Sequence, residues 1–328
     1  MTSSLPRSPD MTEGAIGGFF ELELSTGSEY HQGALRTGSG RMAFELIVKA
    51  SEAECVWLPH FICNSMVDTV RHAGAECRFF HLDEEMWPII DDPDAGERDL
   101  LLYVNYFGIF SHQVQMLSEK FGSLIIDNAQ SFFSRSIPGV STFYSARKFF
   151  GVPDGSYLFT NLKTQTIPEF KRISGRPGYL TERIDMGAEA AFSGFQEHEN
   201  SFQNAPVQGM SPLGRRILRS IDYGRVRRVR LENYLYLDRH LKQSNRFSHR
   251  LPEGSVPMVY PYLCGRTDLR ETLTRNRIYT AQYWRDVLAR TDSSTLEYHL
   301  ADRLIPLPID QRYGREEMDR ILEVIENG

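Results

Sequence analysis

Asp127 and Lys148 are two residues whose types and positions in the sequence could do chemistry together. Asp127 follows an apolar run at residues 124–126, while Ser145 and Lys148 follow an apolar run at residues 140–144. Gly, Pro, Asn or Asp bound each run, which is typical of buried strands, and α/β proteins build sites at the ends of such strands. A lysine amine can bind an aldehyde cofactor covalently while an acid pairs with a pyridinium nitrogen. The pair therefore suggests pyridoxal phosphate (PLP).

The residues next to Lys148 fit a reactive amine and also permit one other interpretation. Phe149 and Phe150 follow the lysine, and apolar neighbours make an amine more nucleophilic by desolvating it. Ser145-Ala-Arg-Lys148 also matches S-x-x-K, the nucleophile motif of penicillin-binding proteins. Those proteins need S-D-N and K-T-G as well, whereas this sequence has no S-D-N and reads Lys163-Thr-Gln. This alternative is therefore weakly supported.

A glycine-rich turn, Gly38-Ser-Gly-Arg-Met-Ala43, fits the dinucleotide fingerprint G-x-G-x-x-[GA]. No apolar strand leads into it, and no acid ends a second strand about 20 residues later. An NAD(P)-binding oxidoreductase is therefore a less favoured alternative. A Gly/Ser-rich turn at a helix N-terminus can instead cradle a phosphate. The ordinary alternative is that Ser39 only caps the helix.

The composition is that of an ordinary globular protein, with 328 residues of which 41% are hydrophobic and 24% charged. The net charge of -6 disfavours nucleic acid as a partner, because phosphate contacts need a basic surface. No apolar run approaches the roughly 20 residues of a membrane span, so no membrane partner is expected. The four cysteines contain no C-x-x-C pair, which favours reduced thiols, a cytoplasmic location and no metal site.

The chain up to residue 160 alternates apolar strands with amphipathic helices. We expect an edge strand at 16–24 and further strands at 55–59, 77–81, 101–104, 124–126, 140–144 and 157–159. We expect helices at 42–50, 61–73 and 114–121. This alternation predicts βαβ units and an α/β fold with a large, mostly parallel sheet flanked by helices.

After residue 160 the pattern changes, and we expect a loop at 193–208 followed by a long helix at 213–241. The early part of that helix is basic; its arginines are Arg215, Arg216, Arg219, Arg225, Arg227, Arg228 and Arg230. Such a run is ordinarily a solvated face that pairs with acids, and the alternative is a contact with a substrate phosphate or a second subunit. We then expect a strand at 256–263, helices at 269–275 and 281–288, a strand at 304–307 and a helix at 316–325. The predicted domains are a disordered tail (1–15), a large domain (16–208), and the long helix with a smaller C-terminal α/β domain (209–328).

Taken together, the motifs resemble those of the DegT/StrS-type nucleotide-sugar aminotransferases, which are PLP-dependent enzymes of fold type I. Five segments carry the resemblance. Ser39-Gly-Arg-Met-Ala43 resembles Ser-Gly-Thr-x-Ala, Pro59-His-Phe61 resembles a Thr-Phe or Thr-Trp after a proline-ended strand, and Val104-Asn-Tyr-Phe-Gly108 resembles Val-His-x-x-Gly. Asp127-Asn-Ala-Gln130 resembles Asp-x-Ala-Gln, and Ser145 to Lys148 with the following Pro-Asp-Gly-Ser resembles Ser…Lys and Gly-Glu-Gly-Gly. The resemblance extends over about residues 16–313. The sequence departs from the family at Arg41 and His60, where the family has Thr, and at Phe143, where it commonly has Ser.

The resemblance implies a role for individual residues. Lys148 would carry PLP and Asp127 would hold the pyridine nitrogen. The other expected cofactor contacts are Phe61 on the ring face, Gln130 at the ring hydroxyl or the substrate, and Ser39, Gly40, Arg41 and Ser145 at the phosphate. Asn105, Tyr106 and Tyr313 are candidate substrate residues.

The resemblance also implies transamination from an amino donor, glutamate by family analogy, to a keto acceptor on a nucleotide-linked sugar. A non-catalytic PLP-binding regulatory protein of the same fold is the alternative from another functional class. Family members resemble one another in forming homodimers. The long polar segment between Asp154 and Gln208, with Arg172, Arg176, Asn200 and Asn204, would reach across the two-fold axis to the partner's site.

Overall fold

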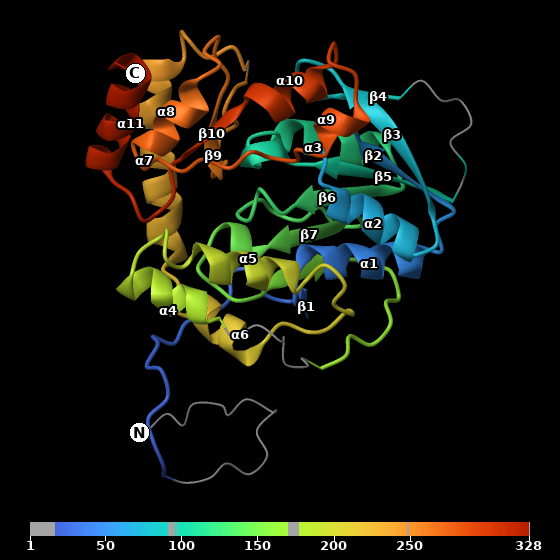
Figure 1. The fold of residues 1–328 in the computed structure, drawn as a ribbon. Coiled ribbons are helices and arrows are strands. Elements are labelled where there is room, and N and C mark those ends of the chain that lie inside the picture. The colour runs from blue at the N-terminus through green and yellow to red at the C-terminus, as the bar shows by residue number, and fades with distance from the viewer. Residues whose placement is uncertain (1–16, 91–95, 97, 170–176, 248, 328) are drawn as a thin grey trace.

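The computed structural model describes residues 17–90, 96, 98–169, 177–247 and 249–327. Figure 1 shows a large sheet covered by helices, beside a smaller part that contains the C-terminus. The predicted α/β fold with a mostly parallel sheet is confirmed. The expected tail at 1–15 lies outside the described residues, and the domain boundaries remain predictions.

The large sheet has eight strands in the order β1-β8-β7-β6-β5-β2-β3-β4. Its strands are β1 (Leu35–Thr37), β2 (Cys55–Pro59), β3 (Glu76–Leu82), β4 (Pro88–Ile89), β5 (Asp99–Val104), β6 (Leu124–Asn128), β7 (Ser141–Ser145) and β8 (Ser156–Phe159). Strands β3, β2, β5, β6 and β7 pair in parallel, whereas β8, β1 and β4 pair antiparallel at the two sides. Every residue of β2 and β6 is buried, which is why these strands read as continuous apolar runs.

The strand order reverses direction between β2 and β5. From β2 the chain moves outward to β3, and from β5 it moves the other way to β6 and β7. Open α/β sheets bind ligands outside the carboxyl ends of the strands at such a switch point. The loops that follow β2, β5, β6 and β7 are therefore where a site is expected.

The helices of the large part are α1 (Gly40–Ser51), α2 (Asn64–His72), α3 (Ser111–Lys120), α4 (Gly178–Asp185), α5 (Phe192–Asn200) and α6 (Pro212–Arg219). Helix α1 begins where Ser39 caps it, and it packs its apolar face on β7 and β8. In Figure 1, α5 lies below β7, and α4 lies below the lower end of α7 (Tyr223–Leu241).

The C-terminal part has a hydrophobic core of its own. Helix α7 supplies Tyr234, Leu237 and Leu241 to this core, and the two-stranded sheet of β9 (Val259–Tyr262) and β10 (Ile305–Pro308) packs beside them. The remaining helices are α8 (Leu269–Arg275), α9 (Val287–Arg290), α10 (Leu296–Arg303) and α11 (Arg315–Asn327). Figure 1 shows α7 running alongside α11 and down toward α6.

Four predicted elements differ in the structure. Residues 17–24 form no strand, and the side chains of Phe19 and Phe20 are 98% and 95% exposed. The expected loop at 193–208 includes most of α5, which was not predicted because its sequence is polar. The expected long helix is two helices, because Asp222 caps a new one. The expected helix at 281–288 shrinks to α9, while α4 and α10 were not predicted.

Within the described residues, no helix combines the length and the apolar character needed to cross a bilayer.

Candidate active site

Asp127 lies near the end of β6, and its side chain is buried at the carboxyl edge of the sheet. Its Oδ1 accepts a hydrogen bond from the Ala129 N–H at 2.7 Å. Burial raises the pKa of Asp127 to about 6, while the charge of Lys148 and the hydrogen bond from Ala129 act in the opposite direction. The charge of Lys148 thus acts on the Asp127 carboxyl, and a pKa of about 6 leaves that carboxyl mostly ionised at neutral pH.

Lys148 ends η2 (Ala146–Lys148), the short turn that follows β7. The Ala146 carbonyl accepts hydrogen bonds from the N–H groups of Phe149 (3.0 Å) and Phe150 (2.9 Å), which closes the turn. Ser145 is buried at the end of β7, whereas Lys148 is exposed and faces a cavity. The turn therefore presents the amine at its surface while its backbone is fixed.

The glycine-rich turn before α1 lies beside the lysine turn, because Gly155 links them. The Gly155 N–H donates to the Gly38 carbonyl at 2.8 Å, and its carbonyl accepts from the Ala146 N–H at 3.0 Å. Gly155 has a φ of +132°, which residues with a Cβ rarely adopt. The Ser39 hydroxyl accepts from the Met42 N–H at 3.4 Å, so this side chain caps the helix. The first backbone N–H groups of α1 are the groups that could bind a phosphate there.

An aromatic layer surrounds Phe61 at the switch point. The Phe61 ring stacks on Tyr106, with centroids 5.5 Å apart, and the Tyr106 hydroxyl donates to the Phe61 carbonyl at 2.9 Å. Trp284 packs edge-on against Phe61 at 4.5 Å. The backbone φ of Trp284, 52°, lies in the left-handed region, which is unusual for a bulky residue. Trp284 therefore reaches over Phe61 from a segment far away in the sequence.

Gln130 and Asn105 are buried beside this layer but differ in their hydrogen bonding. The Gln130 Oε1 accepts from the Phe107 N–H at 2.9 Å, while its Nε2 is buried without a partner among the described residues. The Asn105 amide donates to the Asn128 Oδ1 and accepts from the Phe110 N–H, both at 3.1 Å. Gln130 thus has a donor left for a ligand, and Asn105 holds the surrounding loops.

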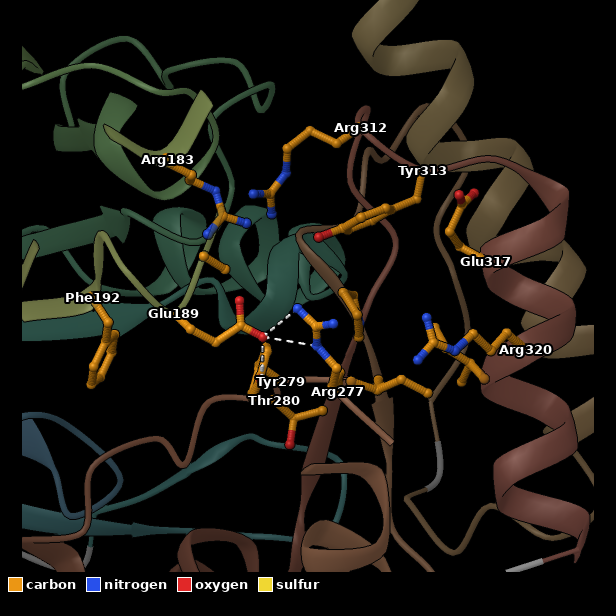
Figure 2. Close-up of a pocket in the computed structure, with 14 residues that line it drawn as sticks. Arg183, Glu189, Phe192, Arg277, Tyr279, Thr280, Arg312, Tyr313, Glu317 and Arg320 are labelled. Atoms are coloured by element: carbon orange, nitrogen blue, oxygen red, sulfur yellow. Dashed lines mark hydrogen bonds and ion pairs between the residues drawn. The ribbon is translucent and has the colours of Figure 1, made fainter. Parts of the chain in front are cut away.

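A cavity of about 780 Å³ lies in front of Lys148, between α4, α5 and the C-terminal part. A second cavity, of about 590 Å³, continues from it toward α11 and is shown in Figure 2. The residues that line both are Arg183, Ala188, Phe192, Tyr279 and Arg312. Four arginines stand around the second cavity, Arg183, Arg277, Arg312 and Arg320, over apolar walls. The two cavities form one hollow that begins at the amine and ends among four arginines, where Glu189 and Glu317 also line the wall.

Several predicted site residues do not face this hollow. Arg41 donates to the Phe202 carbonyl at 2.5 Å, so its guanidinium is directed toward α5 instead of the phosphate turn. Asn105 and Tyr106 are fully buried and hydrogen bonded inside the protein, Phe61 is fully buried as well, and none of the three lines either cavity. Tyr313 does line the second cavity. The predicted residues Arg172 and Arg176 lie outside the described residues.

Sequence reasoning missed Arg230, which was placed on a solvated helix face but is only 1% exposed. A signal for its burial was present, because Val226, Arg230, Tyr234, Leu237 and Leu241 follow helical spacing and all lie on the buried face of α7. Other arginines of the run do pair with acids, as Arg216 does with Glu21. Trp284 and Arg290 were also missed, because their partners lie more than 200 residues away in the sequence. Trp284 packs on Phe61, and Arg290 donates to the carbonyls of His60 and Ile62.

The chemistry of these groups fits PLP at the carboxyl edge of the sheet. The charge of an exposed lysine acts on a buried acid, the amide donor of Gln130 is buried without a partner among the described residues, and a helix N-terminus adjoins the lysine turn. The dinucleotide alternative fits less well. The strand before the glycine-rich turn, β1, is a short antiparallel strand at the side of the sheet, whereas a dinucleotide fold needs a central parallel one.

The fold is that of the fold-type-I aminotransferases, as the comparison with solved structures shows. No protein-family model matches the sequence, and no curated protein matches it. Three similar solved structures illustrate the fold.

A DegT/DnrJ/EryC1/StrS aminotransferase from Brucella abortus has 17% identity and a TM-score of 0.60, covering 90% of this chain and 85% of its own. DesV from S. venezuelae has 18% identity and a TM-score of 0.62, covering 90% of this chain and 84% of its own. The PLP form of a putative sugar aminotransferase from Streptococcus pneumoniae has 15% identity and a TM-score of 0.60, covering 90% and 86%. At these identities the similarity establishes the shared fold.

Proposed function

We propose that this protein is a PLP-dependent aminotransferase that acts on a sugar. The observation that supports this most is the buried Asp127 carboxyl, on which the charge of Lys148 acts at the carboxyl edge of a sheet with this fold. Lys148 would hold the cofactor covalently and Asp127 would contact the pyridine nitrogen. The Gln130 Nε2 would donate to the ring hydroxyl, Ser145 and the N-terminus of α1 would bind the phosphate, and Phe61 would pack on the ring.

When bound, PLP would supply an electron sink for the carbon that loses or gains a proton. The chain's own groups would do the rest. Asp127, in its ionised form, would keep the ring nitrogen protonated. Lys148, once released from the cofactor, would move the proton as a general base and then as a general acid. The closed turn at Ala146 would keep that amine in place, and the walls of α4 and α5 would limit access of water.

The hollow favours an elongated, anionic acceptor, and we propose a keto sugar linked to a nucleotide. The sugar would lie near Lys148, while the phosphates and base would lie in the second cavity. There Arg183 and Arg320 could meet phosphate oxygens, and Tyr279 and Tyr313 could pack on a ring. Glutamate is the proposed donor.

The first test is the visible spectrum of the protein incubated with PLP. We expect a yellow band that disappears on borohydride treatment, with the label retained on Lys148 by mass spectrometry. A Lys148→Ala variant that keeps the same adduct contradicts the proposal. Loss of the band on addition of glutamate, and its return with a keto-sugar nucleotide, would establish turnover.

The same experiment separates the alternatives. A protein that binds PLP at Lys148 but responds to no amino donor is a non-catalytic PLP-binding protein of the same fold. A protein that does not bind PLP but enhances the fluorescence of reduced nicotinamide is an oxidoreductase.

A further inference from the structure

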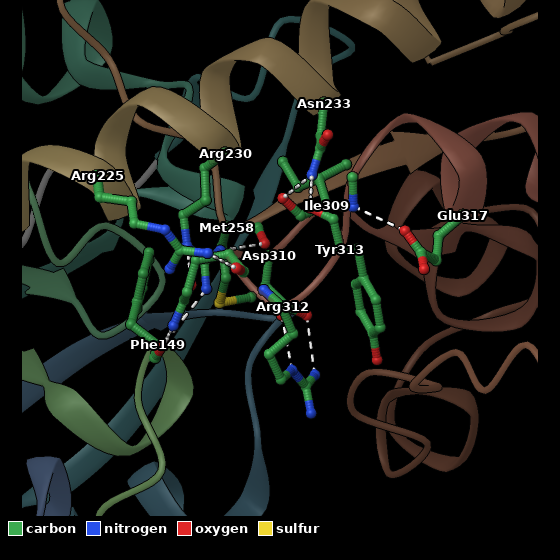
Figure 3. Close-up of polar contacts among 12 residues, drawn as sticks. Phe149, Arg225, Arg230, Asn233, Met258, Ile309, Asp310, Arg312, Tyr313 and Glu317 are labelled. Atoms are coloured by element: carbon green, nitrogen blue, oxygen red, sulfur yellow. Dashed lines mark hydrogen bonds and ion pairs between the residues drawn. The ribbon is translucent and has the colours of Figure 1, made fainter.

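The carbonyl of Phe149, one residue beyond Lys148, is held by two side chains from the C-terminal part of the chain. The Gln311 Nε2 donates to it at 2.7 Å, and an NH2 group of Arg230 donates to it at 3.4 Å. The Arg230 guanidinium also lies over the Phe149 ring, 4.6 Å from its centroid. Figure 3 shows Arg230 reaching from α7 toward Phe149, and Gln311 belongs to the segment after β10.

Arg230 and Gln311 are also bonded to each other. The Arg230 Nε donates to the Gln311 Oε1 at 3.0 Å, and its NH1 donates to the Met258 carbonyl at 2.9 Å. Each nitrogen of the guanidinium therefore has a distinct acceptor, which a planar group with five N–H donors can satisfy but a lysine cannot. The two side chains and the Phe149 carbonyl form a closed three-way contact, which we name the carbonyl clamp.

Burying an arginine at this position costs free energy, which suggests that its side chain has a specific role. Arg230 is 1% exposed, and burial lowers its pKa to about 10. Among the described residues no carboxylate forms an ion pair with it, and Asp310 acts only at longer range. An apolar residue at 230 would complete the buried face of α7 without this cost. The guanidinium instead donates hydrogen bonds to backbone carbonyls, and one of these, the Phe149 carbonyl, adjoins the lysine turn.

The clamp binds a backbone carbonyl for which the lysine turn itself provides no hydrogen-bond donor. Inside the turn, the Ala146 carbonyl takes the N–H groups of Phe149 and Phe150, and the Ala146 N–H is bonded to Gly155. The Phe149 carbonyl has its partners in Arg230 and Gln311. Without them, the peptide between Phe149 and Phe150, which starts one residue beyond Lys148, could rotate and shift the lysine turn.

We propose that Arg230 and Gln311 are positioning residues for Lys148, which couple the placement of its amine to the docking of the C-terminal part on the sheet. The proposal rests on the proposed function, since it assigns Lys148 the reacting amine. It predicts that loosening the clamp changes the dynamics of the lysine turn and the rate of chemistry more than the affinity for ligands.

The experiment uses Gln311→Leu, which removes both bonds of Gln311 from a half-buried position, and Arg230→Lys, which keeps the charge. Arg228→Met, on the same helix but exposed, is the matched control. Hydrogen exchange of the cofactor-free protein is followed at residues 146–152 and throughout the chain. In both clamp variants we expect exchange at 146–152 to rise about tenfold, with other regions little changed. Arg228→Met should match the wild type.

The second readout uses the protein loaded with PLP. The single-turnover rate with saturating glutamate should fall roughly ten- to hundredfold in Gln311→Leu, while the glutamate concentration at half-saturation changes less than about threefold. Uniformly raised exchange, or wild-type exchange at 146–152 in folded Gln311→Leu, overturns the positioning role. If wild-type protein shows no label on Lys148, the proposed function fails instead, and the exchange data still decide whether the clamp holds the turn.

Discussion

Burial of the Asp127 carboxyl raises its pKa to about 6, even though Lys148 and the Ala129 amide favour its ionised form. An acid in this environment carries a free-energy cost when it is ionised, and the cost is fully present above the folded pKa. The folded state binds more protons than the unfolded state between about pH 4 and 6. The contribution of this residue to stability therefore falls as the pH rises through that range.

We predict that Asp127→Asn stabilises the cofactor-free protein at pH 7.5 by at most about 3 kcal/mol, since a shift of two pKa units is about 2.7 kcal/mol. Asn can keep the acceptor for the Ala129 N–H. Below pH 4 the variant and the wild type should be equally stable. Denaturant unfolding at several pH values measures this, and a wild type that is more stable than the variant at pH 7.5 would contradict it.

His60 must be considered in the same titration, because its effect on stability changes with pH in the opposite direction. Burial, followed by the nearby charge of His81, lowers the pKa of His60 to about 4. Its contribution to stability is present above its ordinary pKa of 6.5 and is lost as the pH falls toward 4. The difference between Asp127→Asn and the wild type isolates the carboxyl, because His60 is present in both proteins.

At the scale of elements, α4 and α5 form a wall of the hollow and are attached at two places. At one end, His198 bonds to the Pro153 carbonyl and Glu199 pairs with Arg147, so α5 is tied to the loop after the lysine turn. At the other, Glu189 accepts from Arg277 at 2.9 Å and from the Tyr279 hydroxyl at 2.8 Å (Figure 2). Glu189 thus joins the wall to the C-terminal part across the second cavity.

We predict that Glu189→Gln loosens this wall. Hydrogen bonds from Tyr279 and Arg277 hold the pKa of Glu189 near 2, so the carboxylate is ionised at neutral pH and its neutral substitute binds them less well. Proteolytic cleavage at residues 177–190 should become roughly two- to fivefold faster, a small change because an exposed ion pair contributes little to stability. Raised salt should produce the same change in the wild type. Glu182→Gln, on the exposed face of α4, is the control, and equal cleavage in both variants would exclude the attachment.

At the scale of the whole molecule, apolar side chains remain exposed on one part of the surface. Ile184 is 83% exposed and Met186 71%, and Phe192 and Phe195 are also exposed beside them. This patch, Ile184, Met186, Phe192 and Phe195, lies on the same α4–α5 segment that was expected to cross to a partner. In the structure that segment contacts its own chain through Tyr179 and His198. The segment therefore makes contacts within its own chain, and its exposed apolar side chains, of which Ile184, Phe192 and Phe195 also line the hollow, are available to a second copy.

We predict that the protein sediments as a dimer at micromolar concentration, and that the double variant Ile184→Asp, Met186→Asp sediments as a monomer. Charged groups in the patch would remain unpaired in an interface, whereas in the monomer they would face solvent. Analytical ultracentrifugation measures the masses, and the thermal unfolding of the variant at low concentration shows that it is folded. A wild type that stays monomeric removes the proposed dimer.

A shared active site is tested separately, by mixing two inactive protomers. Lys148→Ala lacks the amine, and a protomer with the 177–202 segment removed lacks the wall. If the segment serves the partner, hybrids that carry one intact site should recover about a quarter of the sites. The contacts within one chain favour the result in which mixing restores nothing.

The sequence alone determined most strands of the large sheet and singled out the two central residues. Continuous apolar runs identify β2 and β6 because both faces of a parallel strand are buried, and helical spacing identifies α8 with the bounds that the structure has. Asp127 and Lys148 stood out because polar residues at the ends of such runs must gather at one edge of a sheet. These conclusions depend on neighbours a few residues apart, which a local pattern records.

Only the tertiary structure decided which side chains face the hollow and which hold the frame. Asn105 and Tyr106 follow a strand just as Asp127 does, yet loops from elsewhere use up their hydrogen bonds. Arg230 belongs to a run of arginines but is buried, since Gln311 and Phe149, each 81 residues away, supply its acceptors. A buried polar group is stable only where such partners converge, and that convergence depends on packing between distant segments that no local spacing encodes.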